Sequence, residues 1–143
     1  MSAKGHHTSA SPVIVWFRED LRLSDHPALQ AAVATGHPLI CLYVLDDETP
    51  ALHPLGGASR WWLHGALADL RRTLGRHQGT LLTLKGSAEK LVPQLARETG
   101  AQSVYWHHRL HQKEREQDER IAIALKTQAT ASEESWGTVL LDP

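Results

Sequence analysis

Residues 13–29 read VIVWFREDLRLSDHPAL, and this stretch decides how the rest of the chain is interpreted. It opens with five apolar residues, Val13 to Phe17, which are typical of a strand buried on both faces. Arginines and acids follow, where a dinucleotide-binding domain would carry a glycine-rich turn. Pro27 suits the first turn of a helix, with Asp25 or His26 before it as the cap. The stretch therefore predicts a buried strand, a charged turn and a helix without a phosphate-binding loop.

Strand and helix patterns alternate along the rest of the chain. Short apolar runs predict further strands at residues 39–45, 80–84, 103–106 and 138–141. Helical patterns lie between them, at residues 28–34, 58–76, 88–99 and 113–126. Such alternation predicts an α/β fold, a three-layer α/β/α Rossmann-like domain with a five-stranded parallel sheet. Ligands of such sheets bind at the carboxyl ends of the strands, near the point where the strand order reverses.

Composition and charge fit one compact folded domain. Of the 143 residues, 41% are hydrophobic and 22% are charged, and the formal net charge is −1. This near-neutral balance does not favour tight DNA binding by the chain alone, because gripping a phosphate backbone needs a basic face. No apolar run approaches the length that spans a bilayer. Residues 1–11 are small and polar, so they are expected to form a disordered leader before a domain at 12–143.

Several kinds of chemical site find no support in the sequence. It contains neither a G-x-G-x-x-G turn after the first strand nor a P-loop, and no serine sits in a nucleophile elbow. His107, His108 and His111 lack the cysteine or carboxylate partners of a known zinc pattern, so they are interpreted as a solvated loop, with no metal site. Cys41 is the only cysteine and lies in an apolar run, which predicts a small buried hydrophobe and a cytoplasmic location.

Residues 15–29 resemble the N-terminal signature of the DNA photolyase and cryptochrome family. That signature runs apolar–Trp–Phe–Arg–x–Asp–Leu–Arg–Leu–x–Asp–Asn–x–Ala–Leu, and His26 stands where Asn is common. Further matches follow in the family's order, at residues 42–46, 59–63, 84–87 and 104–118. The resemblance covers nearly all of residues 13–143. It implies the family's N-terminal α/β domain, which binds or abuts an antenna chromophore.

The resemblance also implies what this chain does not hold. In the family, FAD and the DNA lesion are bound by a larger, all-helical C-terminal domain, which is expected to be the missing partner here. The parent protein would repair cyclobutane pyrimidine dimers in damaged DNA with blue light and reduced FAD. This chain alone is predicted to be inactive, because no catalytic residue of the family maps onto it. A cryptochrome-type signalling domain is the alternative, and this half of the family does not separate the two. A nucleotide-binding domain of the universal-stress type would need a late glycine-rich phosphate loop, which is absent from the sequence.

Glu114 is the main candidate for binding an antenna. It aligns with the glutamate that hydrogen-bonds the pterin in folate-type photolyases, and a carboxylate suits the N–H donors of a pterin. Lys113 stands where that pattern has Asn. The deazaflavin-type pattern has acids at the positions of Arg109 and His111, which makes a deazaflavin less favoured. The resemblance thus favours methenyltetrahydrofolate, and leaves FMN or no antenna as alternatives.

The remaining site predictions concern the strand ends. Arg60 is predicted to serve the antenna cleft or the domain interface, and Val44 and Asp46 are predicted to line the wall of the cleft. Asp20 and Arg22 are interpreted as an ion pair that fixes the turn after the first strand. Arg18, the third charged residue of this structural motif, is then the candidate to face a ligand or a partner.

Overall fold

The structure, a computed structural model, describes residues 11–18, 21, 26–45, 57–76 and 79–135, and of residues 57–62 it describes the backbone alone. The strands are β1 (Val13–Phe17), β2 (Leu39–Leu45), β3 (Leu81–Lys85), β4 (Ser103–His107) and β5 (Ala131–Ser135). The helices are α2 (Pro27–Ala34), α3 (Gly57–Arg76), α4 (Ala88–Thr99) and α5 (Gln112–Thr127).

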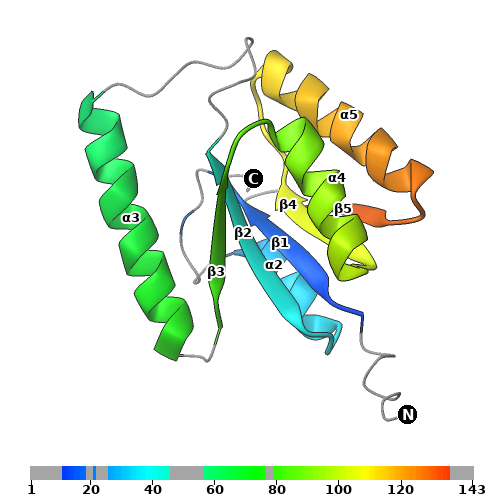
Figure 1. The fold of residues 1–143 in the computed structure, drawn as a ribbon, viewed down its shortest axis with the longest axis horizontal. Coiled ribbons are helices and arrows are strands. Elements are labelled where there is room, and N and C mark those ends of the chain that lie inside the picture. Colours follow the sequence, from blue (N-terminus) through cyan, green and yellow to red (C-terminus); the bar gives the residue numbers. More distant parts are fainter. Residues whose placement is uncertain (1–10, 19–20, 22–25, 46–56, 77–78, 136–143) are drawn as a thin grey trace, which may run out of the picture.

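The strands form one parallel sheet in the order β3-β2-β1-β4-β5 (Figure 1). The chain starts in the centre, moves outward through β2 to β3, and then crosses to β4 and β5. Strand order therefore reverses between β1 and β4. The predicted α/β/α fold with five parallel strands is confirmed.

The two faces of β1 point into two different parts of the core, because successive side chains of a strand alternate in direction. Ile14 and Trp16 pack in a cluster with α4 and α5, whereas Val15 and Phe17 pack in a cluster with α2 and α3. Every residue of β1 and of β4 is buried. The continuous apolar run that predicted β1 thus reflects burial on both sides.

Helix ends follow the local sequence. His26 caps α2, and its Nδ1 accepts a hydrogen bond from the Leu29 N–H at 3.0 Å. Gly100 ends α4 in the left-handed conformation at φ +69°, which a residue with a Cβ rarely adopts. In α3, Leu63, Leu70 and Leu74 are buried and Leu67 is partly buried, so these leucines form the inner face of the helix.

The sequence predicted a strand at residues 138–141, a range that lies outside the described residues. Within the described residues, the fifth strand of the sheet is β5, at Ala131–Ser135, and it pairs with β4. Its sequence, ASEES, has no apolar run, because an edge strand with a mostly exposed surface does not need one. Within the described ranges, no helix is both long and apolar enough to cross a membrane.

Candidate functional site

The point where strand order reverses lies at the carboxyl ends of β1 and β4. We call this place the strand split and define it by Phe17, Arg18 and His107. The chain leaves β1 toward α2 on one face of the sheet and leaves β4 toward α5 on the other. In open α/β sheets, ligands enter between two such diverging connections.

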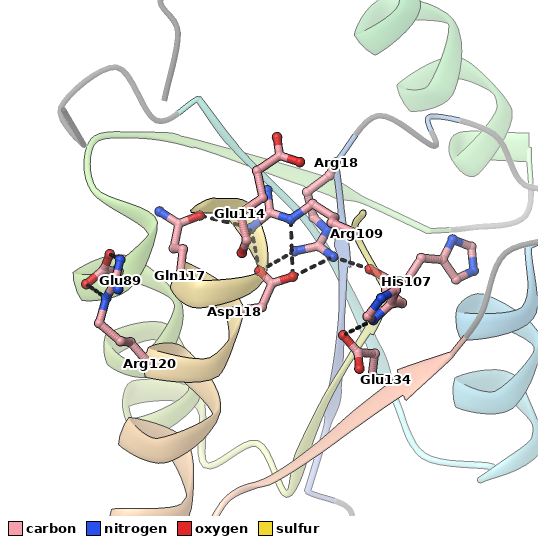
Figure 2. A network of polar contacts seen from close by, with 10 residues as sticks. Arg18, Glu89, His107, Arg109, Glu114, Gln117, Asp118, Arg120 and Glu134 are labelled. Carbon is pink, nitrogen blue, oxygen red and sulfur yellow. Dashed lines mark hydrogen bonds and ion pairs between the residues drawn. The ribbon is translucent and has the colours of Figure 1, made fainter. Parts of the chain in front are cut away.

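On the α5 side, Arg18 crosses the strand split. Its Nη1 donates to Asp118 Oδ1 on α5 at 3.0 Å, and its Nη2 donates to the carbonyl oxygen of His107 at the end of β4 (Figure 2). One side chain thereby connects the end of β1 both to the neighbouring strand and to the helix that follows it. Arg18 was the candidate to face a ligand or partner, and among the described residues its guanidinium points into the domain, toward Asp118 and the His107 carbonyl oxygen.

Arg109 binds the same carboxylate from the loop after β4. Its Nε donates to Asp118 Oδ2 at 3.1 Å, and its Nη2 donates to the other oxygen of that carboxylate. The same Nη2 also donates to Gln117 Oε1 at 2.9 Å and to the carbonyl oxygen of Glu114 at 3.3 Å. Arg109 therefore fixes the first turns of α5. We call Arg18, Asp118 and Arg109 the arginine–aspartate cluster.

The cluster is largely removed from water. The side chains of Arg18, Asp118 and Arg109 are 8%, 5% and 13% exposed. The Arg18 guanidinium lies over the Trp16 ring, 4.4 Å from its centroid, and the Arg109 guanidinium lies 5.5 Å from the same ring. A planar, weakly hydrated guanidinium tolerates such a site better than an ammonium ion would. Because the charges are desolvated, each depends on its partners in the cluster.

On the α2 side, imidazole rings fill the strand split. The His26 and His107 rings stack with centroids 4.2 Å apart, and Phe17 packs on His26 at 4.7 Å. His107 Nε2 accepts a hydrogen bond from the Ala28 N–H at 3.1 Å. The start of a helix offers free N–H groups, which in nucleotide-binding domains hold phosphate. Here Pro27 has no N–H and the next two N–H groups donate to histidines, so this helix start does not fit a phosphate.

Glu114 lies in the first turn of α5, as the sequence predicts. It is half-buried, and its carbonyl oxygen accepts from Arg109. Figure 2 shows its carboxylate directed away from Asp118. None of the described residues bonds to that carboxylate, so it is available as an acceptor. Lys113, beside it, is exposed.

Of the residues predicted to line the cleft, the structure describes the side chain of Val44 alone. Val44 is 8% exposed and packs in the core under α4 and α5, so its side chain does not form an open cleft wall. The side chain of Arg60 lies outside the described residues, as do Asp46, Asp20 and Arg22.

The three histidines after β4 differ from one another. The prediction of a solvated loop is wrong for His107, which ends β4 and is 7% exposed. His108 Nδ1 lies 3.2 Å from a carboxylate oxygen of Glu134 on β5. His111 is exposed at the start of α5. Among the residues with described positions, no group of three or more His, Cys, Asp or Glu side chains is placed to hold a metal ion.

Asp118 is the central residue that sequence reasoning missed. One signal could have found it: Asp118, Ile121 and Leu125 follow the spacing of one helix face, and the other two members of that face are apolar. An acid on an apolar stripe implies a buried partner. That partner, Arg18, lies 100 residues away in the sequence, so no local sequence pattern identifies it.

Comparison with known proteins shows what this arrangement resembles. The DNA photolyase family model matches residues 13–143. A deoxyribodipyrimidine photo-lyase of Agrobacterium fabrum is 48% identical over 99 residues, which cover 69% of this chain and 20% of that protein. A deoxyribodipyrimidine photo-lyase of Synechococcus is 35% identical over 94% of this chain and 28% of its own length. Cryptochrome-1 of Arabidopsis thaliana is 37% identical over 91% of this chain and 19% of its own length.

Solved structures give the same picture. A bacterial class III photolyase from Agrobacterium tumefaciens superimposes with a TM-score of 0.81 at 40% identity, covering 90% of this chain and 26% of that one. A cryptochrome from Synechocystis superimposes with a TM-score of 0.78 at 27% identity, covering 88% of this chain and 27% of that one. The chain thus spans between 19% and 28% of the length of these relatives. With the family model matched from the first strand to the last residue, the chain belongs to the DNA photolyase family.

Proposed function

We propose that this chain is the N-terminal antenna domain of a deoxyribodipyrimidine photolyase. The observation that carries this proposal is the family match over residues 13–143, together with photolyase relatives several times longer than the chain. The parent protein would use blue light and FAD to repair cyclobutane pyrimidine dimers in damaged DNA. A cytoplasmic location is part of the proposal, supported by a lone, buried cysteine.

The assignment of functions to the two domains follows from the family resemblance, which places FAD in the helical domain. We assign residues 12–143 to the α/β domain and residues 1–11 to a leader, and we assign FAD and lesion binding to a separate helical domain. The chain alone should then neither bind damaged DNA tightly nor repair it under blue light. The test is chromatography of dimer-containing oligonucleotides after blue-light irradiation with the purified chain. Loss of dimers catalysed by the chain would contradict this assignment.

The antenna proposal centres on Glu114. Its carboxylate is unoccupied by the described side chains, and the hydrogen bond from Arg109 to the Glu114 carbonyl oxygen holds the turn that carries it. A carboxylate accepts hydrogen bonds from the amino and ring N–H groups of a pterin, so these residues fit the methenyltetrahydrofolate that the family resemblance implies. A bound pterin would absorb light and pass the excitation to FAD. Lys113, Arg60 and Asp46 stay part of the proposed surroundings, and Val44 would support them from the core.

A titration tests the role of Glu114. Methenyltetrahydrofolate is added to the wild-type chain and to Glu114→Gln, and binding is followed by the absorbance and fluorescence of the pterin. Glu114→Gln should weaken binding about tenfold or more, since it removes a charge-assisted acceptor. Glu116→Gln is the matched control, because Glu116 is an exposed acid on the same helix. Equal binding by wild type and Glu114→Gln would exclude Glu114 from the site.

A cryptochrome-type signalling domain is the second candidate. It is favoured by the 37% identity to Arabidopsis cryptochrome-1 over 91% of this chain. The two functions separate in the full-length protein, which repairs dimer-containing DNA under blue light only if it is a photolyase. A full-length protein that binds FAD but leaves dimers intact would favour the cryptochrome.

A further inference from the structure

We propose that the outer face of α2 is an interaction surface, which a helical segment of the longer parent protein covers. We define this outer face by the exposed residues Gln30, Ala31, Val33 and Ala34. The inference rests on the proposed function in one respect, namely that the chain is one domain of a longer protein. It goes beyond that function, because it assigns a particular surface to the rest of the parent protein.

The outer face of α2 carries no charge. The whole helix reads PALQAAVA and contains neither an acid nor a base. A helix on the surface of a globular protein normally has charged or polar side chains on the face opposite the core. The other helices follow this rule, with exposed charged residues such as Arg72 on α3, Arg97 on α4 and Glu119 on α5.

Helix propensity explains the alanines of this face but not Val33. Alanine is the best helix former, so propensity alone accounts for Ala31 and Ala34. Valine is a poorer helix former, because its branched side chain loses freedom against the preceding turn. Val33 is nevertheless 56% exposed, on a helix of only 8 residues. Burial against a partner accounts for an apolar, branched residue at this position.

The size of the outer face indicates which kind of partner fits it. A stable interface between separate proteins uses about 20–30 residues on each side. The outer face of α2 offers far fewer, so it is too small to hold a second copy of the chain or a free protein. A segment of the same polypeptide needs less contact area, because the covalent connection gives it a high effective concentration.

The position of α2 suits a segment that follows this domain in the sequence. α2 lies behind the sheet, on the face opposite α4 and α5, and packs against β1, β4 and β5 (Figure 1). The last described strand is therefore one that α2 contacts. The relatives have ample polypeptide outside the matched part, since the chain covers 28% of the Synechococcus photo-lyase and 26% of the Agrobacterium tumefaciens photolyase. Small alanine side chains let a helix approach closely and pack an apolar side chain of its own against Val33.

Thiol labelling tests this surface. Val33→Cys places a reactive group on the outer face of α2, and Ala68→Cys places one at an exposed position of α3 as the control. Cys41, the only natural cysteine, is buried and should label slowly in both variants. Each variant is labelled with a maleimide, once as the 143-residue chain and once as the full-length parent protein. Circular dichroism shows that each protein is folded.

Val33→Cys should react at least about tenfold more slowly in the full-length protein than in the 143-residue chain, because the partner segment covers it. Ala68→Cys should react at the same rate in both. Equal rates for Val33→Cys in the two proteins would overturn the inference. Slow labelling of Val33→Cys already in the shorter chain would also overturn it, and a dependence of that rate on protein concentration would identify a second copy as the occupant.

A second pair of variants does not depend on cysteine chemistry. Ala31→Lys puts a charge in the middle of the outer face of α2, and Ala68→Lys makes the same change on α3. Both should leave the melting temperature of the shorter chain unchanged. In the full-length protein, Ala31→Lys alone should speed limited proteolysis at least about tenfold, because a charge opposes burial in an apolar contact. Equal proteolysis of the two full-length variants would overturn the inference.

These tests are independent of the photolyase assignment, because neither labelling nor proteolysis needs FAD, a pterin or the repair of dimers. A full-length protein without repair activity would remove that assignment and leave the α2 result intact. Unprotected Val33→Cys in an active photolyase would remove only the role of α2.

Discussion

Two residues of helix α5, Asp118 and Arg120, form ion pairs in opposite surroundings (Figure 2). Asp118 faces the sheet, is 5% exposed, and binds two arginines. Two residues later, Arg120 is 51% exposed and binds Glu89 on α4 at 2.8 Å. Residues two apart on a helix do not share a face, so one helix offers a buried and an exposed version of the same chemistry. The comparison teaches that burial, rather than the presence of opposite charges, decides what an ion pair does for the fold.

The largest expected effect comes from removing the shared carboxylate. Asp118→Ala leaves two guanidinium groups without their common acceptor in a site shielded from water. The free energy of unfolding should fall by about 3–5 kcal/mol, measured by urea denaturation. Glu119→Ala is the control, because it removes an exposed acid from the same helix, and it should change stability by less than about 0.5 kcal/mol. If the free energy of unfolding fell by similar amounts in the two variants, burial would not decide how much a charged residue of α5 contributes to stability.

A triple substitution distinguishes the net contribution of the arginine–aspartate cluster to stability from the loss caused by removing only one of its charges. Replacing Arg18, Asp118 and Arg109 together by Met, Leu and Met removes every charge at once. Because a complete apolar replacement leaves no uncompensated charge, this triple variant should be more stable than Asp118→Ala. The same denaturation experiment measures it. A triple variant less stable than Asp118→Ala would show that the cluster stabilises the fold in its own right.

Cys41 tests burial without any charged partner. It is 3% exposed, and burial raises the pKa of its thiol to about 11. The unfolded chain ionises this thiol near its ordinary value of 9.0, so the folded chain binds more protons between these two values. The corresponding stability is fully present below pH 9 and is lost as the pH rises toward 11, by about 2–3 kcal/mol.

The contribution of Cys41 is measured by comparing wild type with Cys41→Ala. The free energy of unfolding of each is determined with urea at several pH values between 9 and 11. The ionisation of other groups affects both proteins equally, so it drops out of the difference. The advantage of the folded state should decline more steeply in the wild type. Parallel curves would mean that Cys41 ionises without cost in the folded chain. A thiol reagent gives a kinetic check, since labelling should be slow until the chain unfolds.

His107 tests the neutral side of the strand split. His107→Phe keeps a ring against His26 but removes the acceptor of the Ala28 N–H at the start of α2. A buried N–H without an acceptor costs about 1–3 kcal/mol, so the melting temperature should fall moderately. His111→Phe, at an exposed position, is the control and should have little effect. Equal melting temperatures for wild type and His107→Phe would contradict a role for this hydrogen bond.

The contrast between buried and exposed elements also explains which strands could be predicted from the sequence. The strands β1, β2 and β4 were visible because buried strands need continuous apolar runs. Strand β5 was missed because an edge strand with sequence ASEES obeys no such requirement. The first strand and the second were located to the residue, and the position of Glu114 at the start of α5 followed from the helix pattern.

The contacts at the strand split could not be read in the same way. Arg18 and Asp118 are 100 residues apart, and His107 meets Ala28 across 79 residues. Such pairs depend on the strand order, which places β1 beside β4, and a single sequence does not encode that order locally. Arg18 accordingly looked available for a ligand or partner, although its guanidinium lies against Asp118.

The smallest effect is expected for the exposed pair, Glu89 and Arg120. A double-mutant cycle with Glu89→Gln, Arg120→Gln and the combined variant isolates their coupling. Although the hydrogen bond from Arg120 to Glu89 raises the pKa of Arg120, both ends of the pair remain in contact with water. The coupling should therefore be about 0.2–1 kcal/mol. It should also shrink in 1 M salt, where the Debye length falls to about 3 Å. The loss from Asp118→Ala should persist in 1 M salt, because the Asp118 side chain is only 5% exposed and buried charges are screened less. A coupling for Glu89 and Arg120 that equals the loss at Asp118, or that survives high salt, would show that α5 does not distinguish its two faces by burial.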